Sequence, residues 1–302
     1  MQEADIQAIV EAVLAEINRQ QSGGSPAPTA TTTTPPSGNG DLVIDLPDPT
    51  TLEARRTPGL QHPANPDGLR ALMATTPTRI GVGRAGPRPR TKATLLFLAD
   101  HGVTQDALFH EVDPKMLEEM GLFTVESQAR DRQEYLKRPD LGRMLTEESR
   151  QILRERCIKN PDVQIFVGDG LSGAAIEHNL PKIMPVLEQG IKAAGLTMGT
   201  PFFVKNARVG LLNDVNAIVD AKVVAVLIGE RPGLARAESM SIYMGYRPRP
   251  DSTDANRDAI CNIYDGGFNP LEAGAFAVQL IQKMIQYGTS GVDLKLKESG
   301  NG

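Results

Sequence analysis

Tryptophan is absent from this chain of 302 residues, and only 4% of the residues are aromatic. A hydrophobic core therefore has to be built from Leu, Ile, Val, Ala and Met. The two cysteines, Cys157 and Cys261, lie far apart and outside any C-x-x-C pair, so neither a disulfide framework nor a zinc site is indicated. This cysteine usage predicts a reducing, cytosolic compartment.

Catalytic and metal-binding motifs are also missing. The sequence has no H-E-x-x-H, P-loop or G-x-S-x-G, and its four histidines lie apart. We therefore expect neither a metal site nor a Ser–His relay. No apolar run approaches the roughly 20 residues that span a bilayer, and the first residues do not resemble a secretory signal. With 32 basic and 37 acidic residues, the chain has no charge surplus that would predict binding to nucleic acid or to a membrane.

Residues 1–20 form a separate module. Apolar side chains recur there at helical spacing, which predicts an amphipathic helix: Ile6, Ile9, Val10, Val13, Leu14 and Ile17. Residues 21–41 are rich in Pro, Thr, Gly and Ser and predict a flexible linker. A helix on such a linker is typical of a docking segment, and the alternative is a helix that packs back on its own domain. Its polar face is acidic, which disfavours a membrane-surface role.

Residues 42–110 are expected to form an extended arm with helical pieces. Proline and arginine are frequent, and short helices are predicted around Leu52 and Leu69, with a further helix over 92–100. Within the arm, Gly81–Gly86 matches the dinucleotide fingerprint G-x-G-x-x-G. That motif needs a preceding strand and a helix that opens within it, whereas Pro87 and Pro89 follow at once. Its arginines are better explained as contacts to another protein or as a solvated arm.

Residues 111–302 alternate between predicted strands and helices. Strands are expected at 163–167, 201–205 and 223–228, and the helices include 114–119, 127–136, 145–160, 180–194, 215–221 and 271–287. A helix is also expected at 105–111, at the junction with the arm. This alternation predicts an α/β domain with a doubly wound, mainly parallel, Rossmann-like sheet.

Glu230 directly follows the apolar run 223–228 and Gly229. Ligands of open α/β sheets bind beyond the carboxyl ends of the strands, where a carboxylate can accept hydrogen bonds from amides or hydroxyls. The alternative is that Glu230 stands in the first turn of a helix, favoured by the helix dipole. Asp169 and Ser172 follow another strand, where capping of the next helix is favoured over ligand binding.

The segment 257–267 mixes polar residues, a strand-like piece and paired glycines, and it predicts a loop whose backbone can approach a ligand. The chain thus has a ligand crevice but no self-sufficient catalytic constellation. Either it binds a ligand, or it completes an active site that lies mostly on a partner.

Several blocks between about residue 80 and about residue 285 resemble the small subunit of ethanolamine ammonia-lyase. They occur in the order of that family and comprise G-R-A-G-P-R-P-R-T (Gly83–Thr91), F-L-A-D-H (Phe97–His101), R-P-D-L-G-R (Arg138–Arg143), N-P-D-V-Q (Asn160–Gln164), D-G-L-S (Asp169–Ser172), G-T-P-F-F-V (Gly199–Val204) and G-E-R-P-G-L (Gly229–Leu234).

The resemblance implies a bacterial, adenosylcobalamin-dependent ammonia-lyase, a carbon–nitrogen lyase that converts ethanolamine to acetaldehyde and ammonia. The large subunit of that family carries the substrate site and the radical chemistry, and the small subunit closes one side of the cobalamin site. The assembly is a hexamer of large–small pairs in the ethanolamine-utilisation microcompartment of the bacterial cytoplasm. Residues 1–20 would then address the chain to the microcompartment shell or cargo, residues 42–110 would contact the large subunit, and residues 111–302 would contact cobalamin.

Three cobalamin contacts of the family carry over to this sequence. Val209 would pack apolar surface against the cofactor, and Glu230 would accept hydrogen bonds from its amide arms or nucleotide portion. Where relatives have a cysteine two residues after an arginine, this chain has Arg257 followed by Ala259, with Cys261 two residues later. The contact at Ala259 could therefore involve only the backbone. No catalytic residue is expected in this chain.

A histidine that replaces the lower base of cobalamin belongs to the motif D-x-H-x-x-G in other proteins. None of the four histidines here has aspartate two positions earlier, so the lower base is expected to stay on cobalt. Two other functions remain open from the residues alone. One is a stand-alone nucleotide-binding enzyme that uses Gly81–Gly86, and the other is a non-catalytic structural adaptor.

Overall fold

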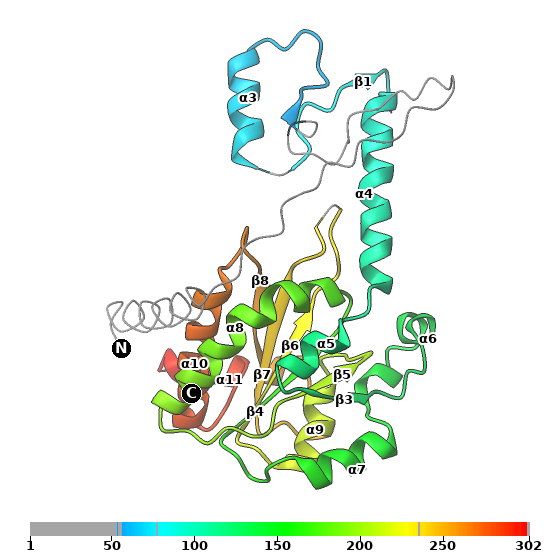
Figure 1. The fold of residues 1–302 in the computed structure, drawn as a ribbon. Helices are drawn as coiled ribbons and strands as arrows, with labels where there is room; N and C mark the ends of the chain where they lie inside the picture. Colours follow the sequence, from blue (N-terminus) through cyan, green and yellow to red (C-terminus); the bar gives the residue numbers. More distant parts are fainter. Residues whose placement is uncertain (1–52, 54–55, 77, 235, 301–302) are drawn as a thin grey trace, which may run out of the picture. The chain divides into compact units, whose positions relative to one another are not determined.

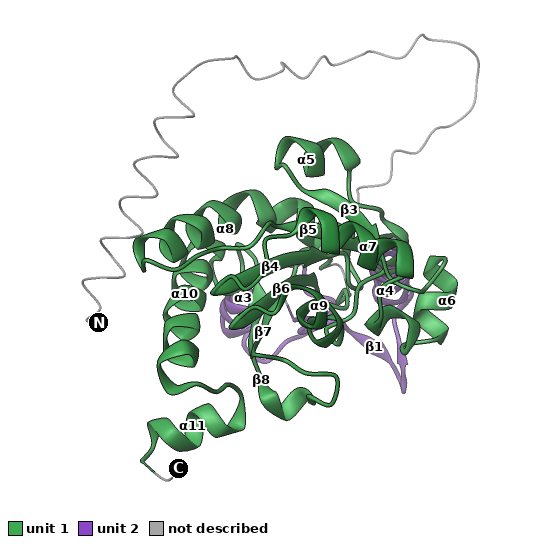
Figure 2. Cartoon of the chain, turned by 90° about the horizontal axis from the view of Figure 1, so that it is seen from below, with its two compact units in different colours: residues 1–14, 104–302 green, residues 15–103 purple. Residues whose placement is uncertain are grey.

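The computed structural model describes residue 53 and residues 56–76, 78–234 and 236–300 (Figure 1). The predicted segments 1–20 and 21–41, and the helix expected around Leu52, lie outside the described residues. Two compact units divide between Val103 and Thr104 (Figure 2). The boundary at 110/111 that separates the predicted arm from the α/β domain stays a prediction.

The unit that ends at Val103 contains a helix, a small hairpin and the first part of a long helix. Helix α3 (Pro66–Thr75) begins at Asn65, whose side chain accepts a hydrogen bond from the Gly68 N–H at 2.8 Å, and this confirms the helix predicted around Leu69. Strands β1 (Arg84–Ala85) and β2 (Arg88–Pro89) pair as an antiparallel hairpin.

The G-x-G-x-x-G segment contains strand β1 of this hairpin, and β2 follows the motif. The next helix, α4 (Thr91–Phe109), begins only after both prolines, so no helix opens within the glycine motif, as the sequence predicts. Helix α4 joins the two helical pieces expected at 92–100 and 105–111 and continues into the second unit.

The second unit is built on one mixed sheet of six strands, in the order β3-β5-β4-β6-β7-β8. Strands β3 (Phe123–Glu126), β5 (Phe202–Lys205), β4 (Val163–Gly168) and β6 (Val223–Gly229) are parallel neighbours, whereas β7 (Met240–Tyr246) and β8 (Arg257–Ile263) continue the sheet with antiparallel pairing. The α/β prediction is confirmed. The more specific Rossmann-like, doubly wound arrangement stays a prediction.

Helices lie on both faces of the central strands because β4 and β6 are buried at every position and, apart from Gln164 of β4, are built of apolar residues. On one face, α8 (Gly173–Ala193) and α10 (Pro270–Tyr287) pack on residues such as Ile165 and Ala225. On the other face, α7 (Glu147–Arg156) and α9 (Leu211–Val219) pack on residues such as Phe166 and Val226.

The last two strands are covered unequally. On the α8/α10 face, Met244 of β7 and Ile260 of β8 belong to the buried core. On the α7/α9 face, Tyr243 is half-buried at the margin of the core, while Ala259 and Cys261 of β8 are exposed. The sheet therefore presents an open face at β8, next to the half-buried Tyr243 of β7 and the helix-covered part.

Several boundaries differ from the sequence-based expectation. Helix α8 begins at Gly173 rather than near residue 180, because the Ser172 hydroxyl caps it by accepting from the Ala175 N–H, and because the helix tolerates Pro181 and Pro185 in its interior. Strands β3, β7 and β8 were not predicted, and the segment expected to be a loop at 257–267 begins with β8. The remaining elements are α5 (Pro114–Glu119), predicted with these bounds, α6 (Arg132–Lys137), α11 (Val292–Glu298) and the 3₁₀ turns η1 (Leu141–Arg143) and η2 (Asp254–Asn256).

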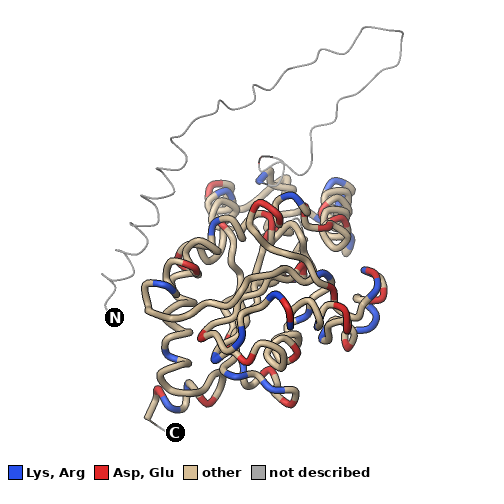
Figure 3. Tube along the Cα trace, turned by 60° about the horizontal axis from the view of Figure 1, so that its bottom comes forward, with Lys and Arg blue, Asp and Glu red and all other residues tan. Residues whose placement is uncertain are grey.

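Acidic and basic residues are interspersed along the described chain (Figure 3). None of the helices formed by the described residues has the length and apolar character needed to cross a bilayer.

Candidate functional site

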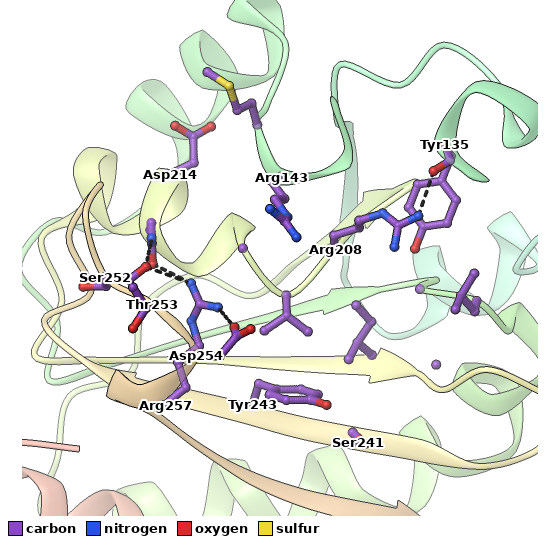
Figure 4. Close-up of a pocket in the computed structure, with 18 of the residues that line it drawn as sticks. Tyr135, Arg143, Arg208, Asp214, Ser241, Tyr243, Ser252, Thr253, Asp254 and Arg257 are labelled. Atoms are coloured by element: carbon purple, nitrogen blue, oxygen red, sulfur yellow. Dashed lines mark hydrogen bonds and ion pairs between the residues drawn. The ribbon is translucent and has the colours of Figure 1, made fainter. Parts of the chain in front are cut away.

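A pocket of about 990 Å³ lies at the carboxyl ends of β4 and β6, within the second unit (Figure 4). This is the edge of the sheet at which α/β proteins bind ligands, and the volume is at the upper end of the range for small-molecule sites. Its lining comes from the turns after β4, β5 and β6, from α6, α9, β7 and η1, and from the segment before β8: Tyr135, Arg143, Met144, Gly170, Leu171, Arg208, Val209, Gly210, Asn213, Asp214, Ala217, Ile228, Gly229, Glu230, Arg231, Ser241, Tyr243, Pro250, Ser252, Thr253, Asp254 and Arg257.

Glu230 lines this pocket and joins three strands. Its Oε2 accepts a hydrogen bond from the Ser239 hydroxyl at 2.6 Å, and its Oε1 accepts from the Ser241 hydroxyl and from the Asn262 N–H at 2.8 Å. The carboxylate thus ties the end of β6 to the start of β7 and the end of β8. A carboxylate offers about four acceptor positions, so one remains for a ligand. The helix-start alternative is not what the structure shows, since β7 rather than a helix follows Glu230.

Val209 lines the same pocket from the loop between β5 and α9. It is partly buried against the core on the α7/α9 face. The loop is fixed by Asp169, whose carboxylate accepts from the Asn206 and Ala207 N–H groups at 2.9 Å each. Burial raises the pKa of Asp169, while Arg132 and these N–H groups oppose the shift. Asp169 therefore clamps β4 to the loop that carries Val209, whereas Ser172 is the helix cap.

Ala259 lies outside the pocket lining. It is exposed on β8 and pairs with Tyr243 of β7, which does line the pocket. Residues directly opposite on antiparallel strands project to the same face, so Ala259 extends the pocket wall onto the open face of the sheet. Burial, and then the neighbouring Cys261, raise the pKa of Tyr243. The structure brings Val209 and Glu230 together and leaves Ala259 at the adjoining surface.

Arginines form much of the remaining pocket wall, and the sequence analysis does not identify them as site residues. Arg257 is only 8% exposed, is paired with Asp254, and donates from Nη2 to Asn213 Oδ1 at 3.1 Å, which holds η2 against α9. Arg208 donates to the Tyr135 carbonyl at 2.8 Å and stacks on that ring, 4.3 Å from its centroid. In the sequence, Arg143 and Arg208 are marked only by a nearby glycine, in Leu141-Gly142-Arg143 and Arg208-Val209-Gly210. This pattern is too common to indicate a site.

The lining contains no histidine or cysteine, so it offers neither a Ser–His nor a Cys–His pair. No group of three or more His, Cys, Asp or Glu side chains placed to hold a metal occurs in the part of the chain that the structure describes. The Nε atoms of Arg208 and Arg257 are buried in the pocket wall without a hydrogen-bond partner. The volume of the pocket and these unpaired donors suit the binding of a large polar ligand.

A model of the family described as ethanolamine ammonia-lyase light chain (EutC) matches residues 66–295. The matched range includes every residue that lines the pocket and covers more than half of the chain. The chain therefore belongs to the ethanolamine ammonia-lyase light chain family.

Proposed function

We propose that this chain is the small subunit of an adenosylcobalamin-dependent ethanolamine ammonia-lyase and forms one side of its cobalamin site. Membership of the family makes the chain a subunit of a lyase with a large-subunit partner. The observation that carries the proposal is the pocket at the strand ends, which is lined by Val209 and Glu230 and adjoins the open face of β8. A large ligand can fill the pocket with one part and cover this face with another.

The residues present fit such a cofactor. Val209 offers apolar contact, and Glu230 keeps an acceptor position for an amide or hydroxyl donor of the ligand. Ala259 has no side chain beyond a methyl group, so a ligand can approach the β8 backbone closely. The unpaired Nε atoms of Arg208 and Arg257 show that the wall still has donors to satisfy.

Adenosylcobalamin, when bound, supplies homolysis of its carbon–cobalt bond for the radical reaction. The residues of this chain bind the cofactor, orient it and exclude water from one side. Substrate binding and radical chemistry belong to the large subunit, which converts ethanolamine to acetaldehyde and ammonia.

The assembly is proposed to be a hexamer of large–small pairs in the ethanolamine-utilisation microcompartment of the bacterial cytoplasm, addressed through residues 1–20. Residues 42–110 are proposed to contact the large subunit. In support, α4 exposes several large apolar side chains that a partner would cover, namely Leu95, Phe97, Leu98 and Phe109.

The test is co-expression with the large subunit, followed by gel filtration with adenosylcobalamin and an ammonia-release assay. The wild-type complex is expected to retain corrin absorbance and to release ammonia only when the cofactor is present. Val209→Glu should lose most of the retained corrin absorbance, because it buries a charge against the ligand. The matched control Val292→Glu introduces the same charge on α11, where Val292 is 53% exposed, and should retain the cofactor.

Two results would contradict the proposal. Stable association of the subunits without any corrin retention would indicate a structural adaptor. Ammonia release by the large subunit alone at the full rate would show that this chain does not complete the site.

A further inference from the structure

Three arginines of the pocket have no acidic partner. Arg143 and Arg231 are exposed, and neither makes an ion pair with a described residue. Arg208 donates to the neutral carbonyl of Tyr135 and to no carboxylate of the described chain. The pocket lining therefore contains three guanidinium groups that no carboxylate of the described chain pairs with.

The three acids of the lining are already engaged and pair with none of these arginines. Asp214 pairs with Arg150 at 2.5 Å and also accepts from the Leu145 N–H at 2.7 Å. Asp254 pairs with Arg257. The third acid, Glu230, accepts hydrogen bonds from neutral donors within the β6–β7–β8 junction and keeps its negative charge. The lining therefore carries four arginines against three carboxylates, a surplus of one positive charge, and three of these arginines pair with none of the carboxylates.

Arg143 and Arg208 are held beside each other by reciprocal contacts with glycines. A Cβ atom at Gly210 would meet Cγ of Arg143 at 2.8 Å, and one at Gly142 would meet Cγ of Arg208 at 2.9 Å. Each arginine stem thus crosses the loop that carries the other arginine, and Figure 4 shows both side chains at the same side of the pocket. Guanidinium groups that lack a carboxylate partner are available to an anion such as a phosphate.

Backbone N–H groups beside Arg143 and Arg208 add further hydrogen-bond donors. The N–H groups of Val209 and Gly210 make no hydrogen bond to a described residue. Gly210 is the N-cap of the nine-residue helix α9 and has no side chain to cap it, so the positive end of the helix dipole faces the arginine pair. Planar guanidinium groups match the oxygens of a phosphate in a forked geometry, which a lysine cannot reproduce.

We propose that Arg143 and Arg208 bind a phosphate diester. This inference rests on the proposed function, in which the ligand is the phosphate of the nucleotide loop of adenosylcobalamin. Arg143 is the residue to change first, because it is exposed, whereas Arg208 also packs on Tyr135 and its loss would disturb the fold.

The experiment compares two corrinoids on the complete complex with the large subunit. Adenosylcobinamide lacks the nucleotide loop and its phosphate, so it reports binding without the proposed contact. Binding is measured by equilibrium dialysis with corrin absorbance. Arg143→Gln is expected to weaken adenosylcobalamin binding about 10- to 100-fold, the usual effect of losing a hydrogen bond between charged groups, and to change adenosylcobinamide binding less than about twofold.

Two further variants sharpen the result. Arg143→Lys keeps the charge but loses the fork, and it should fall between wild type and Arg143→Gln for adenosylcobalamin alone. Lys192→Gln removes one positive charge from the last turn of α8 and should bind both corrinoids as wild type does.

Equal weakening for both corrinoids, or no weakening for either, would overturn the phosphate contact while leaving the proposed function intact. If the wild-type complex binds neither corrinoid, the proposed function fails and the cofactor is excluded as the source of the phosphate. A thermal-stability experiment with inorganic phosphate then tests whether the arginines bind a free phosphate group. A rise in Tm with phosphate over chloride at matched ionic strength, seen for wild type and lost in Arg143→Gln, supports an anion site for a free phosphate group, and its absence overturns the site.

Discussion

Replacing Glu230 with alanine is expected to lower the free energy of unfolding by about 2–4 kcal/mol. The carboxylate accepts three hydrogen bonds, from Ser239, Ser241 and the Asn262 N–H. Each bond to a charged acceptor contributes about 1.5–3 kcal/mol, but the half-buried Ser239 hydroxyl can turn toward water, whereas the Ser241 hydroxyl is buried. The expected loss is therefore well below the sum of three full bonds.

The companion variants separate the bonds. Ser239→Ala removes one donor and should cost about 1 kcal/mol. Glu230→Gln keeps the size of the side chain and one oxygen acceptor, so it should cost less than Glu230→Ala. In a double-mutant cycle, adding Ser239→Ala to Glu230→Ala should cost less than it does in wild type, because the bond is already gone.

Urea unfolding of each variant is the assay, read from the midpoint with the slope unchanged. A loss below about 0.5 kcal/mol for Glu230→Ala, within the range of ordinary surface substitutions, would refute the idea that this carboxylate holds β6, β7 and β8 together. So would strict additivity with Ser239→Ala.

Two further predictions concern the sheet and the N-terminal segment. Lys222, and then Thr197, hold the pKa of Asp162 down to about 2, so their bonds to Asp162 stabilise the fold fully above about pH 4 and are lost as the pH falls through 2. Asp162→Asn should therefore cost about 1–2 kcal/mol at pH 7 and less at pH 3 in urea unfolding, and a cost that does not change with pH would contradict this. Deleting residues 1–20 should spare ammonia release by the complex but abolish co-localisation of a fluorescent fusion with microcompartment shells, and retained co-localisation would contradict the targeting role.

Secondary structure is predicted best where a single apolar run or a single apolar face determines the element. The buried strand β6 is a continuous apolar run, β4 is interrupted only by Gln164, and α5 has its proline at the start and a clear end. Strands β7 and β8 escaped prediction because the open face of β8 carries Arg257, Ala259 and Cys261 in alternation with buried residues, and because Gly245 interrupts β7. Half of the usual apolar signal is absent from a strand whose outer face is not covered by its own chain.

The pocket shows the same limit. Glu230 could be placed because it directly follows a strand, whereas Val209 was indicated by the family resemblance. The arginine wall could not, since Arg143 reaches the pocket only through contact of η1 with the loop before α9, residues 65 or more positions apart. Such a contact depends on the complete packing of the sheet and its helices, which no local pattern encodes.

Strand β8 is an edge strand, and its geometry bears on how the chain avoids self-association. The unpaired backbone N–H and C=O groups of an edge strand can form hydrogen bonds with a strand of another molecule, which leads to aggregation. Here the register shifts between Met240 and Ile242, and Asn262 adopts a left-handed conformation with φ of 63°, so the ladder is irregular near its end. At the other end, the buried Asp258 carboxylate accepts from the Gly291 N–H at 2.6 Å and fastens the chain after α10 against the strand. Neither end of β8 offers a flat template for another copy.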